Sequence, residues 1–179
     1  MSDPRSGTHV WVDGELLGAS ERHLSAFDRG FQLGDGIFET LRASGGRPTE
    51  LAEHVARLHR SAVGLDIALP GDIDARLAAG IDALLAADGL DGPEADASIR
   101  ITVSRGAFRS RGVLPPDEHV AATVVIQAWP IAPVPDAHLE RGLHLVASSE
   151  NTGALAFYPR AGFEPIPSHE GAQAFARVL

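Results

Sequence analysis

The chain has 179 residues, of which 44% are hydrophobic and 22% charged, and its formal net charge is −9. These values are typical of one folded domain with a sizeable core and exclude a disordered chain. The acidic balance argues against a nucleic-acid or membrane partner. There is no cysteine, and all 15 basic residues are arginine. Disulfides, thiolate chemistry and a lysine nucleophile are therefore excluded within these residues.

No targeting or membrane-spanning segment is visible in the sequence. Residues 1–5 lack the apolar stretch of a signal peptide. No segment approaches the roughly 20 apolar residues that span a bilayer. We therefore expect a cytoplasmic protein.

The first elements are a hairpin and a strand. Asp13 and Gly14 lie between two apolar runs, which predicts a tight turn because glycine tolerates a positive φ. Residues 36–43 alternate between apolar and polar side chains and end in the turn-forming residues 45–48. This alternation predicts a strand.

Two helices are predicted next, over residues 51–65 and 73–87. In both, apolar residues recur every three or four positions, which is the period of one helical face. They are Leu51, Val55, Leu58, Ala62 and Leu65 in the first helix, and Ile73, Leu77, Ile81 and Leu84 in the second. Asp72 is expected to cap the second helix, and Gly89 follows its end.

The second half of the sequence predicts further strands. Residues 97–104 alternate, residues 120–129 form a buried apolar run, and residues 143–148 form a short strand. Prolines at 130, 133 and 135 mark a break, and Asn151 is expected to cap a final short helix. The whole pattern predicts an α+β fold with a mainly antiparallel sheet and two main helices.

Arginines are the main candidates for binding a ligand, and two interpretations of each remain open. Arg57 precedes apolar Leu58, and it either pairs with Glu53 at i−4, or is solvated, or binds an anion through its forked donors. The loop after residue 104 carries Arg105, Arg109 and Arg111. These three side chains are either solvated or form a binding site for the carboxylate of a ligand.

Other residue patterns point to no site. Residues 28–40 contain three glycines, two aspartates and a glutamate, and they are typical of a structural loop that enters a strand. His54 and His59 would point about 140° apart on a helix and cannot share a metal ion. No serine-nucleophile elbow and no phosphate loop with its lysine is present. We therefore expect no metal site.

A series of motifs follows a fixed order along most of the chain. They are Val12-Asp-Gly-Glu, then Asp28-Arg-Gly-Phe-Gln-Leu-Gly-Asp-Gly-Ile-Phe-Glu-Thr-Leu-Arg, His54-Val-Ala-Arg-Leu, Ile99-Arg-Ile-Thr-Val-Ser-Arg-Gly and Glu140-Arg-Gly-Leu-His-Leu-Val-Ala-Ser-Ser. In this order, residues 9–148 resemble the N-terminal domain of the class IV (fold-type IV) aminotransferases. That family depends on pyridoxal 5′-phosphate and includes branched-chain aminotransferases, D-amino-acid transaminases and aminodeoxychorismate lyases.

The resemblance implies a cofactor, a substrate class and roles for particular residues. Arg57 corresponds to the arginine that holds the cofactor phosphate, and Phe38 to the aromatic residue that lines the substrate pocket. The loop with Arg105, Arg109 and Arg111 helps to select the substrate carboxylate in some members, and any of the three is a candidate. Substrates of the family are amino acids and 2-oxo acids, and its members form dimers.

The sequence departs from the family pattern after residue 148. Family members continue into a larger domain with the lysine that binds the cofactor, whereas these residues contain no lysine. Arginine cannot replace it, because its pKa stays above ~12. We therefore predict a truncated chain that is inactive alone and supplies no catalytic residue. Alternatives are a non-catalytic domain acting through protein contacts, or an aminodeoxychorismate-lyase-like half that needs a complementing domain.

The C-terminal residues 149–179 resemble the last helix and strand of a GNAT-type acetyltransferase. The shared pattern starts at Asn151 and includes Tyr158 and Phe163. In that family the tyrosine often protonates the leaving thiolate, but Pro159 interrupts the expected helix and no acetyl-CoA loop precedes it. The favoured interpretation is that Tyr158 and Phe163 pack the tail onto a sheet. The expected domains are therefore 9–148 and 149–179.

Overall fold

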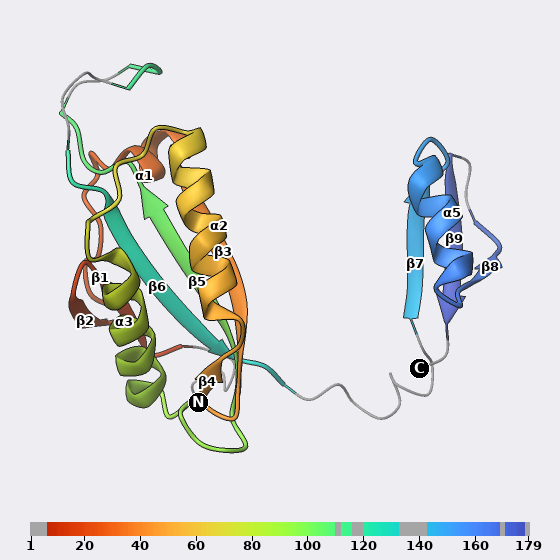
Figure 1. The fold of residues 1–179 in the computed structure, drawn as a ribbon, viewed down its shortest axis with the longest axis horizontal. Helices are drawn as coiled ribbons and strands as arrows, with labels where there is room; N and C mark the ends of the chain where they lie inside the picture. Colours follow the sequence, from red (N-terminus) through yellow and green to blue (C-terminus); the bar gives the residue numbers. More distant parts are fainter. Residues whose placement is uncertain (1–6, 110–111, 116–119, 133–142, 169–170, 178–179) are drawn as a thin grey trace. The chain divides into compact units, whose positions relative to one another are not determined.

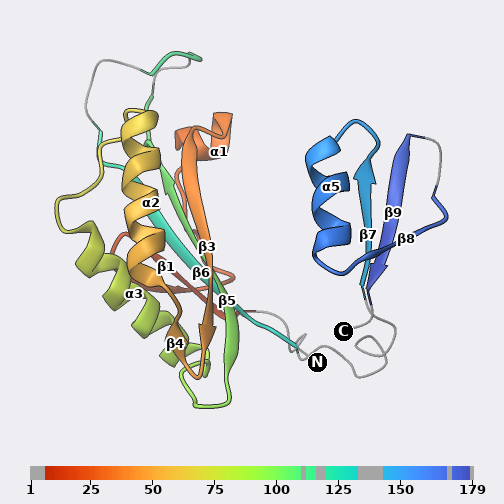
Figure 2. The same ribbon diagram turned by 45° about the vertical axis from the view of Figure 1, so that its right-hand side comes forward.

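The structure is a computed structural model and describes residues 7–109, 112–115, 120–132, 143–168 and 171–177. Contacts divide the chain into two compact units, Met1–Ala132 and Pro133–Leu179 (Figures 1 and 2). Within the described ranges, no helix is long and apolar enough to cross a membrane.

The first unit is a six-stranded antiparallel sheet with two long helices on one face (Figures 1 and 2). Its strands are β1 (His9–Val12), β2 (Glu15–Gly18), β3 (Gly36–Ser44), β4 (Arg47–Pro48), β5 (Asp96–Ser104) and β6 (Thr123–Pro130). They lie in the order β2-β1-β6-β5-β3-β4. The helices are α1 (Arg29–Leu33), α2 (Leu51–Gly64) and α3 (Ile73–Ala87). The predicted α+β fold with a mainly antiparallel sheet is confirmed.

Most local predictions in this unit match the structure closely. Asp13 and Gly14 have φ values of 52° and 114° and form the two-residue turn between β1 and β2. The α3 helix begins and ends at the predicted residues. Asp72 occupies the position before α3 but its side chain makes no capping hydrogen bond. The prediction of a side-chain cap there is therefore wrong.

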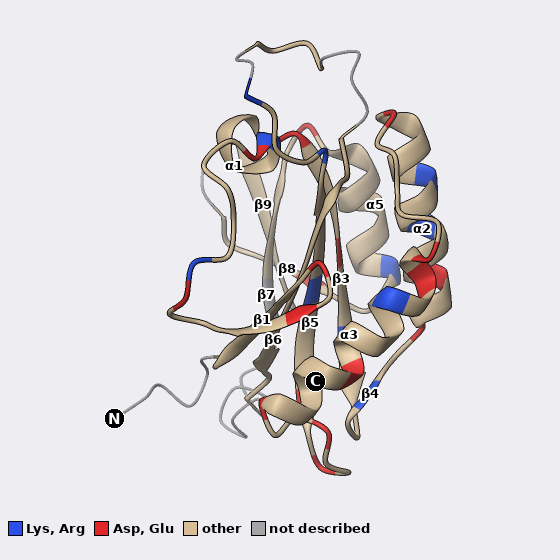
Figure 3. Ribbon diagram, turned by 90° about the vertical axis from the view of Figure 1, so that its left-hand side faces the viewer, with Lys and Arg blue, Asp and Glu red and all other residues tan. Residues whose placement is uncertain are grey.

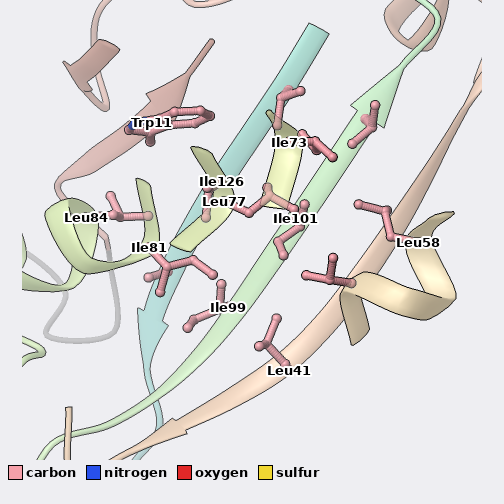
Figure 4. Packing of buried hydrophobic residues seen from close by; sticks show 14 of the residues in the cluster. Trp11, Leu41, Leu58, Ile73, Leu77, Ile81, Leu84, Ile99, Ile101 and Ile126 are labelled. Carbon is pink, nitrogen blue, oxygen red and sulfur yellow. The ribbon is translucent and has the colours of Figure 1, made fainter. Parts of the chain in front are cut away.

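The core lies between the sheet and the two long helices. Every second residue of β3, β5 and β6 faces the helices, so the apolar alternation fills one layer. Figure 4 shows Ile99, Ile101 and Ile126 packed near Leu77 and Ile81. A Cβ atom on Gly80 of α3 would lie 2.8 Å from the Trp11 ring, so the helix approaches β1 closely only because this residue is glycine.

The second unit has its own small antiparallel sheet. Its elements are β7 (Leu143–Ser148), α5 (Thr152–Arg160), β8 (Glu164–Ile166) and β9 (Ala172–Arg177), with the strand order β7-β9-β8. The Asn151 side chain accepts a hydrogen bond from the Ala154 amide at 3.0 Å, which confirms the predicted cap. The β7 strand pairs with β9 and belongs to this compact unit, which begins at residue 133. The expected domains 9–148 and 149–179 stay a prediction.

Aromatic residues hold α5 on this small sheet. The Tyr158 ring lies 5.3 Å from the ring of Phe175 in β9 and 5.7 Å from that of Phe163. Pro159 is tolerated in the last turn of α5. These contacts agree with a packing role for Tyr158 and Phe163. The resemblance of this segment to an acetyltransferase stays a prediction.

Candidate functional site

A cluster of three charged or titratable side chains joins α2 to β3. His54 and Arg57 lie one turn apart on α2, so they share a face. The Arg57 Nε donates to Glu39 Oε1 at 2.8 Å, and its Nη2 donates to Glu39 Oε2. The His54 Nδ1 lies 2.8 Å from Glu39 Oε2. The carboxylate partner of Arg57 is therefore Glu39, and not Glu53, which was one of the alternatives that the sequence left open.

This cluster leaves one side of an arginine open to solvent. The Glu39 side chain is 4% exposed and that of Arg57 is 57% exposed. Hydrogen bonds from Arg57 and then from His54 hold the pKa of Glu39 below its usual value, although burial opposes the shift. The bond to Glu39 raises the pKa of Arg57. No described residue accepts a hydrogen bond from Arg57 Nη1, so this nitrogen can donate to an anion.

Phe38 lies on the other face of the sheet, beside a pocket. The pocket has a volume of about 310 Å³, and its lining includes Phe31, Phe38, Arg100, Thr102 and Val125. The guanidinium carbon of Arg100 lies 3.9 Å from the centroid of the Phe38 ring, which is a cation–π contact. The pocket lining thus combines apolar side chains with hydroxyls, the cation Arg100 and the carboxylate residue Asp28. The sequence analysis missed Arg100, although its alternation in β5 already indicated a position on the polar face.

Arg57 and Phe38 do not line one common pocket. Phe38 and Glu39 are neighbours in β3 and point to opposite faces of the sheet. The two faces meet at the outer edge of β3, where β4 pairs only with Ala43 and Ser44. No described strand pairs with this edge from Gly36 to Leu41. A ligand that contacts both side chains would therefore lie along this edge.

The three predicted carboxylate-binding arginines differ in the structure. The Arg105 side chain is 14% exposed. It donates from Nε to Asp35 Oδ2 at 2.9 Å, from Nη1 to the Asp66 carbonyl at 2.6 Å, and from Nη2 to the Leu65 carbonyl at 2.8 Å. All three of its nitrogens thus bind the chain itself. Arg109 is exposed, and Arg111 lies outside the described residues.

A buried arginine that the sequence analysis did not single out shares Asp35 with Arg105. The Arg29 side chain is 3% exposed, and its Nε donates to Asp35 Oδ2 at 2.6 Å. Burial favours a raised pKa for Asp35, but hydrogen bonds from Arg105 and Arg29 outweigh it and leave the pKa below its usual value. In Figure 3, basic and acidic positions lie close together on the ribbon beside α1.

The neighbouring Asp28 has a structural role. Its carboxylate accepts hydrogen bonds from the Gly30 amide at 2.8 Å, from Ser104 Oγ at 2.7 Å and from Thr123 Oγ1 at 2.8 Å. This agrees with the interpretation of residues 28–40 as a structural loop. Among the residues that the structure describes, no group of three or more His, Cys, Asp or Glu side chains could hold a metal ion.

Comparisons with known proteins agree on one family. The family model for class IV amino-transferases matches residues 36–156. D-alanine aminotransferase of Listeria innocua is 29% identical over 109 residues, which are 61% of this chain and 36% of that protein. The chain therefore spans about a third of the length of this relative.

Solved structures share the fold, among them the following two. A 4-amino-4-deoxychorismate lyase from Pseudomonas aeruginosa is 34% identical, with a TM-score of 0.56 over 75% of this chain and 44% of that chain. A hypothetical aminotransferase from Mycobacterium tuberculosis in its PLP-bound form is 26% identical, with a TM-score of 0.53 over 72% of this chain and 40% of that one.

Proposed function

Because the chain belongs to the class IV aminotransferase family, we propose that it forms the part of a pyridoxal-phosphate enzyme that holds the cofactor phosphate and the substrate. The observation that carries this proposal is Arg57, an exposed arginine that buried Glu39 holds in place. Its free Nη1 donor and its permanent positive charge suit a phosphate oxygen.

The residues present fit one end of the cofactor. The phosphate end fits Arg57, beside the unpaired edge of β3. The cofactor supplies an electron sink for chemistry at the substrate Cα. These 179 residues include no lysine, the side chain whose amine would bind its aldehyde. We propose that these residues are inactive alone and act with a complementing domain or second subunit that supplies the amine.

The substrate side of the proposal places an amino acid or 2-oxo acid on the open face of the sheet. Phe38 and Arg100 line the pocket there. Because Arg105 donates all its nitrogens to the chain, exposed Arg109 is the candidate for the substrate carboxylate that remains among those of the three predicted arginines that the structure describes. Arg111 remains a second candidate. We also expect the protein to be cytoplasmic and dimeric.

A lyase related to the P. aeruginosa enzyme is the second candidate function. It is supported by 34% identity to that enzyme over 75% of this chain. Both functions need the same phosphate anchor. With a complementing domain supplied, release of pyruvate from aminodeoxychorismate would favour the lyase, and amino transfer to a 2-oxo acid would favour the aminotransferase.

The direct test is a titration of the full chain with pyridoxal phosphate, in which binding is measured by the quenching of Trp11 and Trp129 fluorescence. We expect saturable binding that Arg57→Ala weakens at least ~10-fold, because a charge-assisted hydrogen bond is lost. Arg60→Ala is the matched control, since Arg60 is exposed on the same helix. Because the chain has no lysine, imines with surface lysines do not obscure the signal.

Two results would contradict the proposal. One is binding that Arg57→Ala and Arg60→Ala reduce equally. The other is pyridoxal, which lacks the phosphate, binding as tightly as pyridoxal phosphate. An absence of any binding would favour the non-catalytic alternative, a domain that acts through protein contacts.

A further inference from the structure

The side chain of Arg29 donates hydrogen bonds to a segment of the chain that is far away in sequence. Its Nη1 donates to the Gly112 carbonyl at 3.0 Å, and its Nη2 donates to the Val113 carbonyl at 2.9 Å. These carbonyls are more than 80 residues away in sequence. With Nε bonded to Asp35, all three nitrogens of this buried arginine bind the chain itself.

The backbone around Arg29 holds the other end of the same segment. The Arg29 amide donates to the Gly106 carbonyl at 2.9 Å, and the Phe108 amide donates to the Phe27 carbonyl at 3.0 Å. Asp28 and Ala107 form an isolated β-bridge. The exposed Arg109 therefore lies between two parts of the chain that are both anchored on residues 27–29.

Arg105 uses the same carboxylate for a different segment. Its two terminal nitrogens bind the carbonyls of Leu65 and Asp66, just after α2 ends. Asp35 thus joins two arginines, with side chains 3% and 14% exposed, that fix separate segments. This arrangement provides a matched pair of residues for an experiment.

We infer that Arg29 is a positioning residue for the substrate side of the site: it fixes the backbone that presents Arg109. This inference rests on the proposed function for the part that Arg109 plays. The Arg29 side chain is 3% exposed and all three of its nitrogens bind the chain, so it acts through the loop and not by touching a ligand. Only the planar fork of arginine donates to Asp35 and to two adjacent carbonyls at once.

The test compares Arg29→Lys with Arg105→Lys in the full chain. Both variants keep a positive charge beside Asp35 but lose the forked contacts to backbone carbonyls. An arginine-specific protease cuts the chain after exposed Arg109, and mass spectrometry follows the rate. Because the introduced lysines are not cut, the two variants can be compared directly. Cleavage after Arg76, within the well-packed α3, reports global unfolding.

We expect Arg29→Lys to raise the rate after Arg109 about fivefold or more, because local opening exposes the backbone. The rate after Arg76 stays within about twofold in both variants, and Arg105→Lys leaves the rate after Arg109 within about twofold. An unchanged rate after Arg109 in Arg29→Lys would overturn the inference. So would an equal rise in both variants, or a parallel rise after Arg76.

A second measurement adds 2-oxoglutarate and pyridoxal phosphate as probes. We expect these ligands to protect Arg109 from cleavage in the unmodified chain and in Arg105→Lys, but not in Arg29→Lys. Equal protection in all three would overturn the inference. A lack of protection in the unmodified chain would contradict the proposed role of Arg109, whereas the ligand-free rates would still test Arg29 by itself.

Discussion

Two carboxylates four residues apart, Asp35 and Glu39, hold arginines in opposite ways. Asp35 binds Arg29 and Arg105, whose side chains are 3% and 14% exposed, and both arginines donate their other nitrogens to backbone carbonyls. Glu39 binds Arg57, whose side chain is 57% exposed and keeps an unused nitrogen. The first cluster binds only the chain, whereas the second presents a cation to solvent.

The difference separates a structural arginine from a binding arginine. An arginine that donates all its nitrogens to the chain gains nothing from a ligand, and the fold loses stability when its counter-charge is removed. An arginine held on one edge by a buried carboxylate is pre-organised, so less conformational freedom is lost when an anion binds. The two clusters should therefore respond differently to the same chemical change.

Replacing the carboxylate of Asp35 is expected to have the largest effect on stability. Asp35→Asn leaves two arginine charges without a counter-charge, one of them almost fully buried. We expect a loss of about 3 kcal/mol in the free energy of unfolding, measured by urea denaturation. A loss below about 1 kcal/mol would show that the contacts to backbone carbonyls are sufficient alone.

The matching change at Glu39 is expected to cost less stability and more binding. In Glu39→Gln, Arg57 can turn into solvent, so we expect a loss of about 1 kcal/mol in unfolding free energy. Pyridoxal phosphate affinity should fall several-fold because Arg57 is no longer held. Unfolding in urea and the same ligand titration measure both effects. Unchanged affinity would mean that Glu39 does not position Arg57.

The change in stability with falling pH is expected to be the smallest of these effects. Arginine hydrogen bonds keep the pKa of Asp35 and of Glu39 below their usual values. The stabilisation is therefore fully present above their unfolded-state pKa of about 4 and is lost as the pH falls through the folded-state values. Urea midpoints should fall less steeply below about pH 4 in Glu39→Gln than in the unmodified chain. Identical slopes would contradict this account.

The local elements could be predicted from the sequence because their causes are local. Apolar periodicity gave the limits of α3, and Asp13-Gly14 gave the turn between β1 and β2. The grouping of β7 could not be predicted, because its pairing partner β9 lies about 30 residues later and alternation does not name a partner.

The candidate site was predictable only in part. The resemblance singled out Arg57 and Phe38, but the partner of Arg57 is a β3 residue, and only folding brings α2 and β3 together. Arg29 looked like one residue of a glycine-rich loop, since nothing local indicates contacts with carbonyls more than 80 residues away. Spacing likewise could not separate the partly buried Arg105 from the exposed Arg109.

The most direct test of the contrast is the nitrogen-15 spectrum of the arginine side chains during a pyridoxal phosphate titration. The signals of Arg29, Arg57 and Arg105 are assigned by their disappearance in single Arg→Lys variants. The account predicts that the Arg57 Nε signal shifts and saturates, whereas those of Arg29 and Arg105 stay in place. A stationary Arg57 signal, or equal shifts in all three, would contradict it.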